Sequence, residues 1–122
     1  MTTTPNRPWL ESYPEGVPAT VEPTGTLVDL LDTSFHQHAS RQAALFLNQP
    51  VTFRTLDEQS TALGAWLQGK GLARGARVAL MMPNLPQYMV AIAAVLRAGY
   101  VVVNVNPLYT PRELQHLSLI HI

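Results

Sequence analysis

The sequence predicts an α/β fold in which a mixed or parallel sheet is flanked by helices. Two short apolar runs, residues 78–82 and 100–103, have the composition of strands that are buried on both faces. Between them, Pro86 suits the first turn of a helix, the residues from Tyr88 to Leu96 are all apolar, and Gly99 ends the stretch, which predicts a helix that is buried almost all round. Two buried strands joined by a helix form a crossover unit with parallel strands, and the other elements are arranged around this unit.

Length and composition limit the functions that this chain can have. Its 122 residues are enough for one small domain with a core, and 47% of them are hydrophobic. Eight basic and eight acidic residues balance, so the charge does not favour nucleic acid or a polybasic membrane contact. The sequence contains no cysteine, which excludes disulfides, thiolate metal sites and a cysteine nucleophile within it.

The sequence carries no signal for export or membrane insertion. Its N-terminal segment lacks the apolar core of a signal peptide. The longest apolar candidate, residues 88–103, is interrupted by Arg97 and Gly99 and is shorter than the roughly 20 residues that span a bilayer. We therefore expect a cytoplasmic protein, while peripheral contact with a membrane cannot be inferred from these residues.

An extended arm is predicted over residues 1–25, because five prolines occur there without a regular apolar pattern. We expect Trp9, Leu10 and Tyr13 to hold this arm against a neighbouring surface. A peptide-like binding motif is the alternative interpretation of the same segment.

A helix is predicted over residues 27–38, with Thr26 as its N-cap. The apolar residues expected on one face of it are Leu27, Leu30, Leu31 and Phe35. His36 and His38 are two residues apart, so they point in different directions and are not expected to bind a metal together. Asp29 and Asp32 lie on the same helix, where a solvated face is favoured over acid–base catalysis.

A hairpin and a second helix are predicted next. Residues 43–47 and 51–53 have strand composition and flank an Asn-Gln-Pro turn. Thr55 and Glu58 have the spacing of a capping box, which predicts that the helix begins there. The residues expected on its apolar face are Leu56, Leu63, Trp66 and Leu67, and those expected to end it are Gly69 or Gly71.

Residues 64–71 match seven of the eight positions of a phosphate-binding P-loop. The last position is Gly71, where the motif requires a hydroxyl that binds magnesium. A P-loop also follows a strand, whereas this segment ends a predicted helix, so we interpret its glycines as helix-stop and turn residues. The spaced glycines Gly69, Gly71 and Gly75 fail as a dinucleotide-binding fingerprint for the same reason.

The loop over residues 104–109 is the place where geometry favours a ligand, because open α/β sheets bind ligands beyond the carboxyl ends of their strands. Its asparagines and Pro107 are also typical of a simple turn, and we favour this interpretation. A last helix is predicted to begin just after it, with Thr110 as N-cap and Pro111 at the first position.

Several strings together resemble a known family. They are MPNLPQY at residues 82–88, RAG at 97–99, NVNPLYT at 104–110 and REL at 112–114. In order and spacing, residues 9–116 are similar to the N-terminal part of bacterial long-chain fatty-acid CoA ligases, which belong to the adenylate-forming, AMP-binding family. The resemblance implies a place in the first subdomain of the large N-terminal domain of such an enzyme.

The resemblance also implies an activity for the parent protein. Such ligases use ATP and Mg²⁺ to convert a fatty acid to an acyl-adenylate, and then transfer the acyl group to coenzyme A. Their phosphate loop, adenine-binding motif, magnesium-binding glutamate, ribose-binding aspartate and catalytic lysine have no counterpart in this sequence. We therefore expect an inactive fragment and assign it no catalytic, cofactor-binding or metal-binding residue.

Three segments follow from this interpretation: the arm at residues 1–25, a partial adenylate-forming domain at 26–116 and a tail at 117–122. The tail reads LSLIHI, which resembles the translation of a sequencing-library adapter, so we expect it to be non-native. Two alternatives remain for the function. The parent could activate another carboxylic acid, such as an aryl or medium-chain acid, or the chain could be a stand-alone α/β binding module.

Overall fold

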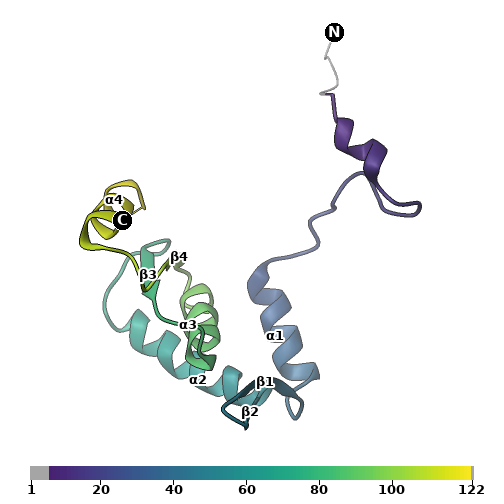
Figure 1. Ribbon diagram of the computed structural model, residues 1–122. Helices are drawn as coiled ribbons and strands as arrows, with labels where there is room; N and C mark the ends of the chain where they lie inside the picture. The colour runs from purple at the N-terminus through teal and green to yellow at the C-terminus, as the bar shows by residue number, and fades with distance from the viewer. Residues whose placement is uncertain (1–5, 122) are drawn as a thin grey trace.

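The computed structural model describes residues 6–121 (Figure 1), so the ends of the predicted arm and tail, residues 1–5 and 122, lie outside the described residues. The α/β class is confirmed. In chain order the elements are η1 (Pro8–Ser12), α1 (Leu27–Gln37), β1 (Gln42–Phe46), β2 (Gln49–Thr52), α2 (Phe53–Gln68), β3 (Arg77–Met81), α3 (Pro86–Arg97), β4 (Val101–Val105) and α4 (Pro111–His121).

The central crossover unit is confirmed. Strands β3 and β4 pair in parallel, with Arg77 opposite Val101 and Met81 opposite Val105, and α3 connects them. Proline occupies the first turn of α3, and Gly99 follows the helix with φ of +85°, a conformation that glycine adopts without strain. The proline and the glycine therefore predict both ends of this helix correctly.

The prediction that both strands are buried on both faces is wrong for this chain. On β3, Leu80 packs into the core with α3, whereas Ala79 and Met81 are exposed. On β4, Val103 and Val105, which the register pairs with Ala79 and Met81, are buried. The helix α3 covers one face of the sheet, and among the described residues no second helix packs extensively on the other. For the same reason, the prediction that α3 is buried almost all round fails in its first turns, where Met89 is exposed.

The core consists of two clusters that share α3. One cluster lies between α2, α3 and the sheet, and contains Leu67, Leu80, Ala91, Ala94, Val95 and Tyr100. The other lies between α1, α2 and α3, and contains Phe35, Leu56, Val90 and Ala93. Because both clusters draw on α3, its position fixes the sheet and the helices together. No helix in the range 6–121 is both long enough and apolar enough to cross a bilayer.

The hairpin is confirmed, but its turn lies earlier than predicted. Strands β1 and β2 are antiparallel, and the two residues between them, Leu47 and Asn48, have φ of +48° and +61°. Two consecutive residues with positive φ form the turn that suits the twist of a two-stranded hairpin. Gln49 and Pro50, which were predicted to lie in the turn, belong to β2.

The first helix is confirmed at its cap but not along its whole apolar face. The Thr26 hydroxyl accepts a hydrogen bond from the Asp29 N–H, and the Asp29 carboxylate accepts one from the Thr26 N–H, which forms a capping box. Phe35 is buried and Leu31 packs against it, whereas Leu27 and Leu30 are exposed. The N-terminal half of α1 thus lacks a covering surface in this chain.

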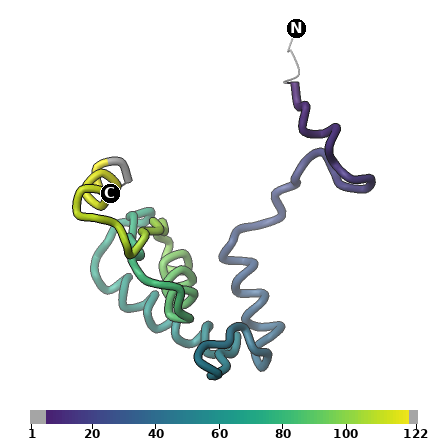
Figure 2. The backbone as a smooth tube through the Cα atoms, in the orientation of Figure 1, coloured from purple at the N-terminus to yellow at the C-terminus, as the bar shows by residue number. Residues whose placement is uncertain are grey.

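From residue 6 to residue 25, the predicted arm contains a short 3₁₀ helix, η1, a turn at Glu15 and Gly16, and otherwise no regular secondary structure. Figure 2 shows that it runs away from the helices and strands instead of folding back onto them. Trp9 and Tyr13 are exposed, so the expectation that they anchor the arm is wrong for this chain.

The second helix begins earlier than predicted. Its N-cap is Thr52, whose hydroxyl accepts a hydrogen bond from the Thr55 N–H at 3.1 Å, so the predicted capping box at Thr55 and Glu58 is wrong. The hairpin strand β2 ends at Thr52, and the helix α2 begins at the next residue. Trp66, predicted on the apolar face, is 58% exposed, and the Lys70 Nζ lies 4.2 Å from the centroid of its ring.

We expect Thr52→Ala to loosen the start of α2, because the substitution removes the acceptor for the Thr55 N–H. Loss of such a cap costs about 1 kcal/mol, which corresponds to amide exchange roughly fivefold faster in the first turn. Hydrogen exchange followed by NMR measures this change. Glu58→Ala is the control: it removes the side chain that a capping box at Thr55 would need, and we expect no effect on exchange in the first turn. Faster exchange in Glu58→Ala but not in Thr52→Ala would assign the cap to Thr55.

Candidate functional site

The strongest candidate site is a cavity of about 650 Å³ at the carboxyl ends of β3 and β4, which we call the sheet-edge cleft. The loop at residues 104–109, predicted from sequence as the place for a ligand, forms much of it. The residues that line the sheet-edge cleft are Met82, Pro83, Asn84, Tyr88, Asn104, Val105, Asn106, Pro107, Leu108 and Tyr109.

Two elements position the polar groups of this cleft. The Tyr88 hydroxyl on α3 donates a hydrogen bond of 2.6 Å to Asn104 Oδ1 near the end of β4. Asn106 Oδ1 then accepts from the Leu108 N–H at 3.0 Å, and the Asn106 carbonyl accepts from the Tyr109 N–H. The loop is therefore a hydrogen-bonded turn, as the favoured interpretation of the sequence states, and it also lines the cavity.

The sheet-edge cleft can bind or position a group, but its side chains are poorly suited to chemistry. Its polar side chains are neutral amides and phenols, and none of its lining residues is acidic or basic. Proton transfer near neutral pH and the binding of phosphate or Mg²⁺ both favour charged or readily titrating groups, which this lining lacks. Within the described residues, no group of three or more His, Asp or Glu side chains could hold a metal.

His36 lies in the last turn of α1, and His38 is its C-cap. His36 Nδ1 is 2.7 Å from the Asp32 carbonyl oxygen, one turn back on the same helix. The His38 ring packs beside Phe53, with 5.9 Å between the ring centroids. Each imidazole thus has its own local contact.

The segment that resembles a P-loop ends a helix, as the sequence interpretation states. Gly64 lies inside α2, where an added Cβ would be 3.3 Å from the Ala94 carbonyl oxygen of α3. Its missing side chain therefore allows the two helices to approach closely. Gly69 is the C-cap of α2, and Gly71 has φ of +72° in the turn that follows.

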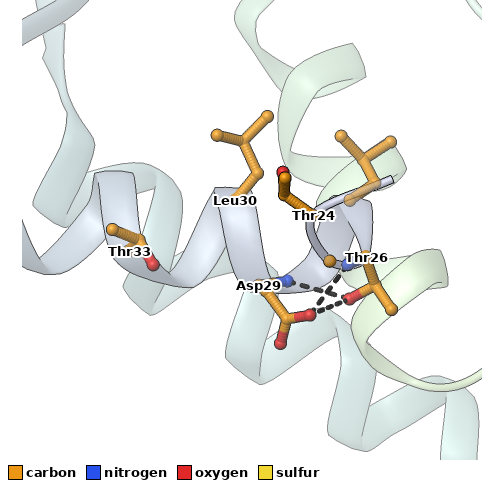
Figure 3. A pocket seen from close by; sticks show the side chains of 7 residues that line it. Thr24, Thr26, Asp29, Leu30 and Thr33 are labelled. Carbon is orange, nitrogen blue, oxygen red and sulfur yellow. Dashed lines mark hydrogen bonds between the residues drawn. The ribbon is translucent and has the colours of Figure 1, made fainter. Parts of the chain in front are cut away.

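Asp29 caps its own helix beside a shallow cavity of about 480 Å³ (Figure 3). The Thr26 hydroxyl and N–H both donate to its carboxylate, at 2.7 and 2.8 Å. These hydrogen bonds lower the pKa of Asp29 below its ordinary value of 3.8. Asp29 is thus ionised and already bonded at neutral pH, which makes it a poor acid–base catalyst.

Asp32 belongs to a different group, which we call the Arg97 cluster: Arg97, Asp32, Asp57 and Ser60. The Arg97 Nε lies 3.1 Å from Asp32 Oδ1, and an Nη lies 2.9 Å from Asp57 Oδ1. The same Nη donates to the Ser60 hydroxyl at 2.8 Å, and Ser60 is fully buried. The guanidinium also lies 5.5 Å from the centroid of the Phe35 ring. These contacts join α1, α2 and α3.

Sequence reasoning missed the Arg97 cluster. It gave Arg97 no partner, because Asp32 and Asp57 are far away along the chain and no local spacing connects them. It also missed the bond between Tyr88 and Asn104, although both residues belong to the crossover unit that the sequence predicted. In that unit both residues come at the same edge of the sheet, and this shared position could have predicted the hydrogen bond between them.

Comparison with known proteins gives a consistent result. A family model described as "AMP-binding enzyme" matches residues 31–118. The chain is 50% identical over 111 residues to a long-chain-fatty-acid–CoA ligase of Yersinia pestis, covering 88% of this chain and 20% of the relative. It is 39% identical over 111 residues to the ligase of Bacillus subtilis (strain 168), covering 90% of this chain and 20% of the relative. The chain thus spans about a fifth of these curated relatives.

Solved structures place the fold in one part of a larger protein. The N-terminal subdomain of Klebsiella oxytoca NpsA in space group C2 matches with a TM-score of 0.74 and 28% identity, over 78% of this chain and 25% of that chain. The same subdomain in complex with anthranilyl-AMSN matches with a TM-score of 0.71 and 30% identity, over 75% of this chain and 24% of that chain. The fold predicted from sequence, part of an adenylate-forming N-terminal subdomain, is confirmed.

Acidification should release the Asp29 cap. A carboxyl whose pKa is lowered by folding stabilises the fold above its unfolded pKa, and that contribution is lost as the pH falls through the folded pKa, below 3.8. NMR titration of the Asp29 carboxyl should give a pKa below 3.8, and Thr26→Ala should raise it. Glu113, whose pKa is lowered in the same way by Thr110, is the control and should titrate identically in both proteins. An unchanged Asp29 titration in the variant would contradict the assigned cause.

Arg97→Met should loosen the whole helical layer, because it leaves the carboxylates of Asp32 and Asp57 without their shared partner. Losing one partner of a partly buried ion pair should cost about 2 kcal/mol, discounted for exposure to solvent. That cost corresponds to roughly 30-fold faster exchange of the α3 amides. Arg112→Met, on exposed α4, is the matched control. Equal exchange in the two variants would show that the Arg97 cluster does not hold the helices together.

Proposed function

We propose, since the chain belongs to the AMP-binding enzyme family, that it is the N-terminal part of an ATP-dependent long-chain fatty-acid CoA ligase. The observation that carries the proposal is its 50% identity over 111 residues to a long-chain-fatty-acid–CoA ligase. The parent would join a fatty acid to ATP, release pyrophosphate, and transfer the acyl group from AMP to the thiol of coenzyme A. Adenylation supplies a good leaving group, which makes thioester formation feasible.

The residues of this chain do not fit ATP, Mg²⁺ or coenzyme A phosphates as direct ligands. The sheet-edge cleft has no charged lining residue, and the acids of the Arg97 cluster are already paired with the guanidinium. The described acids thus offer no set of free carboxylates for a divalent cation. We therefore derive no chemical step from this chain and infer that it is inactive alone.

The role proposed for this chain is to provide a scaffold. The Tyr88 hydroxyl fixes Asn104, and the Asn106 turn fixes the loop that follows, so the sheet edge has one shape before any ligand arrives. A preformed edge lowers the entropic cost of binding next to it. The Arg97 cluster holds the helices behind that edge. We expect the parent to act in the cytoplasm, with peripheral contact with the inner membrane left open.

A different carboxylic acid is the second candidate within the family. NpsA, whose structures include complexes with anthranilyl-AMSN, shares 30% identity with this chain. The Yersinia pestis ligase shares 50%, which favours a long-chain fatty acid. A stand-alone binding module is the candidate from another class, and the family match over residues 31–118 disfavours it.

A chimaera tests the proposal. Residues 9–116 of this chain replace the matching segment of the Yersinia pestis ligase, and pyrophosphate release is measured with palmitate, ATP and coenzyme A. We expect kcat/KM within about tenfold of the native host, because the catalytic motifs stay intact and the scaffold is related. The matched control places the same segment in Klebsiella oxytoca NpsA, where we expect a larger loss. A chimaera that unfolds cooperatively but has no ligase activity would refute the proposal.

A further inference from the structure

The charges of this chain are balanced in total but unevenly distributed. No acidic residue occurs between Glu58 and Glu113, whereas five basic residues lie in that stretch. One of them, Arg97, is paired with Asp32 and Asp57. Three of the others lie between the end of α2 and the first residue of β3. The total charge, which did not favour a polybasic membrane contact, therefore does not describe this part of the molecule.

We call the surface at this place the basic patch and define it by Trp66, Lys70, Leu72, Arg74 and Arg77. Its three cations are exposed, and within residues 6–121 none of them forms an ion pair with a carboxylate. Two large apolar side chains belong to the same surface, because Trp66 is 58% and Leu72 is 44% exposed. The Lys70 Nζ lies over the Trp66 ring, so the indole and a positive charge are presented together.

Backbone contacts hold the turn of the basic patch in one shape. Gly71 and Gly75 have φ of +72° and +81°, which glycine adopts without strain. The Tyr100 hydroxyl donates a hydrogen bond to the Leu72 carbonyl oxygen at 3.4 Å, and the Gly75 N–H donates one to the Gly99 carbonyl oxygen at 2.9 Å. The turn is thus tied to the segment between α3 and β4.

We infer that the basic patch docks on the surface of a lipid bilayer that contains anionic headgroups. Lysine and arginine side chains near such a surface are attracted by its negative potential. Tryptophan is favoured at the boundary between headgroups and acyl chains, and the exposed Leu72 adds apolar area that enters the same boundary. The inference goes beyond the proposed function and does not depend on it.

The arrangement of the basic patch favours a bilayer over a free anion or a second copy. A small anion is held by converging donors, whereas the three cations are spread from the end of α2 to the start of β3. Trp66 and Leu72 line neither the sheet-edge cleft nor the cavity beside Asp29. Two copies that met through this patch would bring like charges together, which is unfavourable.

Docking through the basic patch also sets an orientation. Arg77 is the first residue of β3, whereas the sheet-edge cleft lies at the carboxyl ends of β3 and β4. The patch and the cleft are therefore at opposite ends of the parallel strands. A bilayer bound at the patch leaves the cleft turned away from the lipid.

Vesicle co-sedimentation tests the inference in the 122-residue chain and in the chimaera. The vesicles contain phosphatidylcholine, with or without anionic phosphatidylglycerol, and we expect tighter binding to the anionic ones. Binding to them should weaken about fivefold in each of Lys70→Gln, Arg74→Gln and Arg77→Gln, because each loses one cation near the surface. Arg54→Gln, which removes an exposed arginine at the other end of α2, is the matched control and should bind as the unsubstituted chain does.

Tryptophan fluorescence gives a second readout that leaves the basic patch intact. The sequence has two tryptophans, so Trp66 is the only one that remains in Trp9→Phe. We expect its emission to move to shorter wavelength with anionic vesicles, because the indole leaves water for the headgroup boundary. Added sodium chloride should reverse both the shift and the binding, since it screens the attraction.

Four results would overturn the inference. The first two are equal binding by Arg74→Gln and Arg54→Gln, and a Trp66 emission that anionic vesicles do not change. Displacement by inorganic phosphate, but not by chloride at the same ionic strength, would assign the patch to a free anion. Binding by the chain but not by a folded chimaera would show that the patch is covered in the parent. An inactive chimaera that binds anionic vesicles through the patch would refute the proposed function while supporting the inference.

Discussion

The Arg97 guanidinium holds the helical layer on which the sheet is built. It lies at the end of α3 and reaches Asp32 on α1 and Asp57 on α2, so one side chain connects three helices. The Asp32 oxygen that it faces is buried and has no hydrogen-bond partner among the described residues, so the guanidinium charge is what stabilises it there. Since α3 also carries both core clusters, a shift of α3 would move the sheet edge and its loop.

The sequence was sufficient where the signals are local. The parallel unit, the hairpin, the Thr26 cap and the stop at Gly99 each follow from residues within a few positions of one another. It failed at the start of α2, because Thr52 and Thr55 are both acceptable caps and only the geometry of the preceding strand selects Thr52. It also failed for the Arg97 cluster and for the bond between Tyr88 and Asn104, which depend on the tertiary arrangement.

The strand prediction failed only in part. The apolar runs predicted strands that are buried on both faces, whereas Ala79 and Met81 on β3 are exposed and Val103 and Val105 on β4 are buried. Leu27 and Leu30, predicted on the apolar face of α1, are exposed as well. For the candidate site, the sequence pointed to the loop at residues 104–109, and the structure has a cavity there whose neutral lining suits positioning better than catalysis.

The most direct test of the proposed identity is to read the coding DNA from the codon for His116 onward. We expect the native frame to continue into a Ser/Thr/Gly-rich loop ending in Pro-Lys-Gly, as the family resemblance implies, and adapter codons to encode residues 117–122. A stop codon in native sequence directly after Ile122 would refute the proposed identity, because the chain would then lack every motif needed for adenylation.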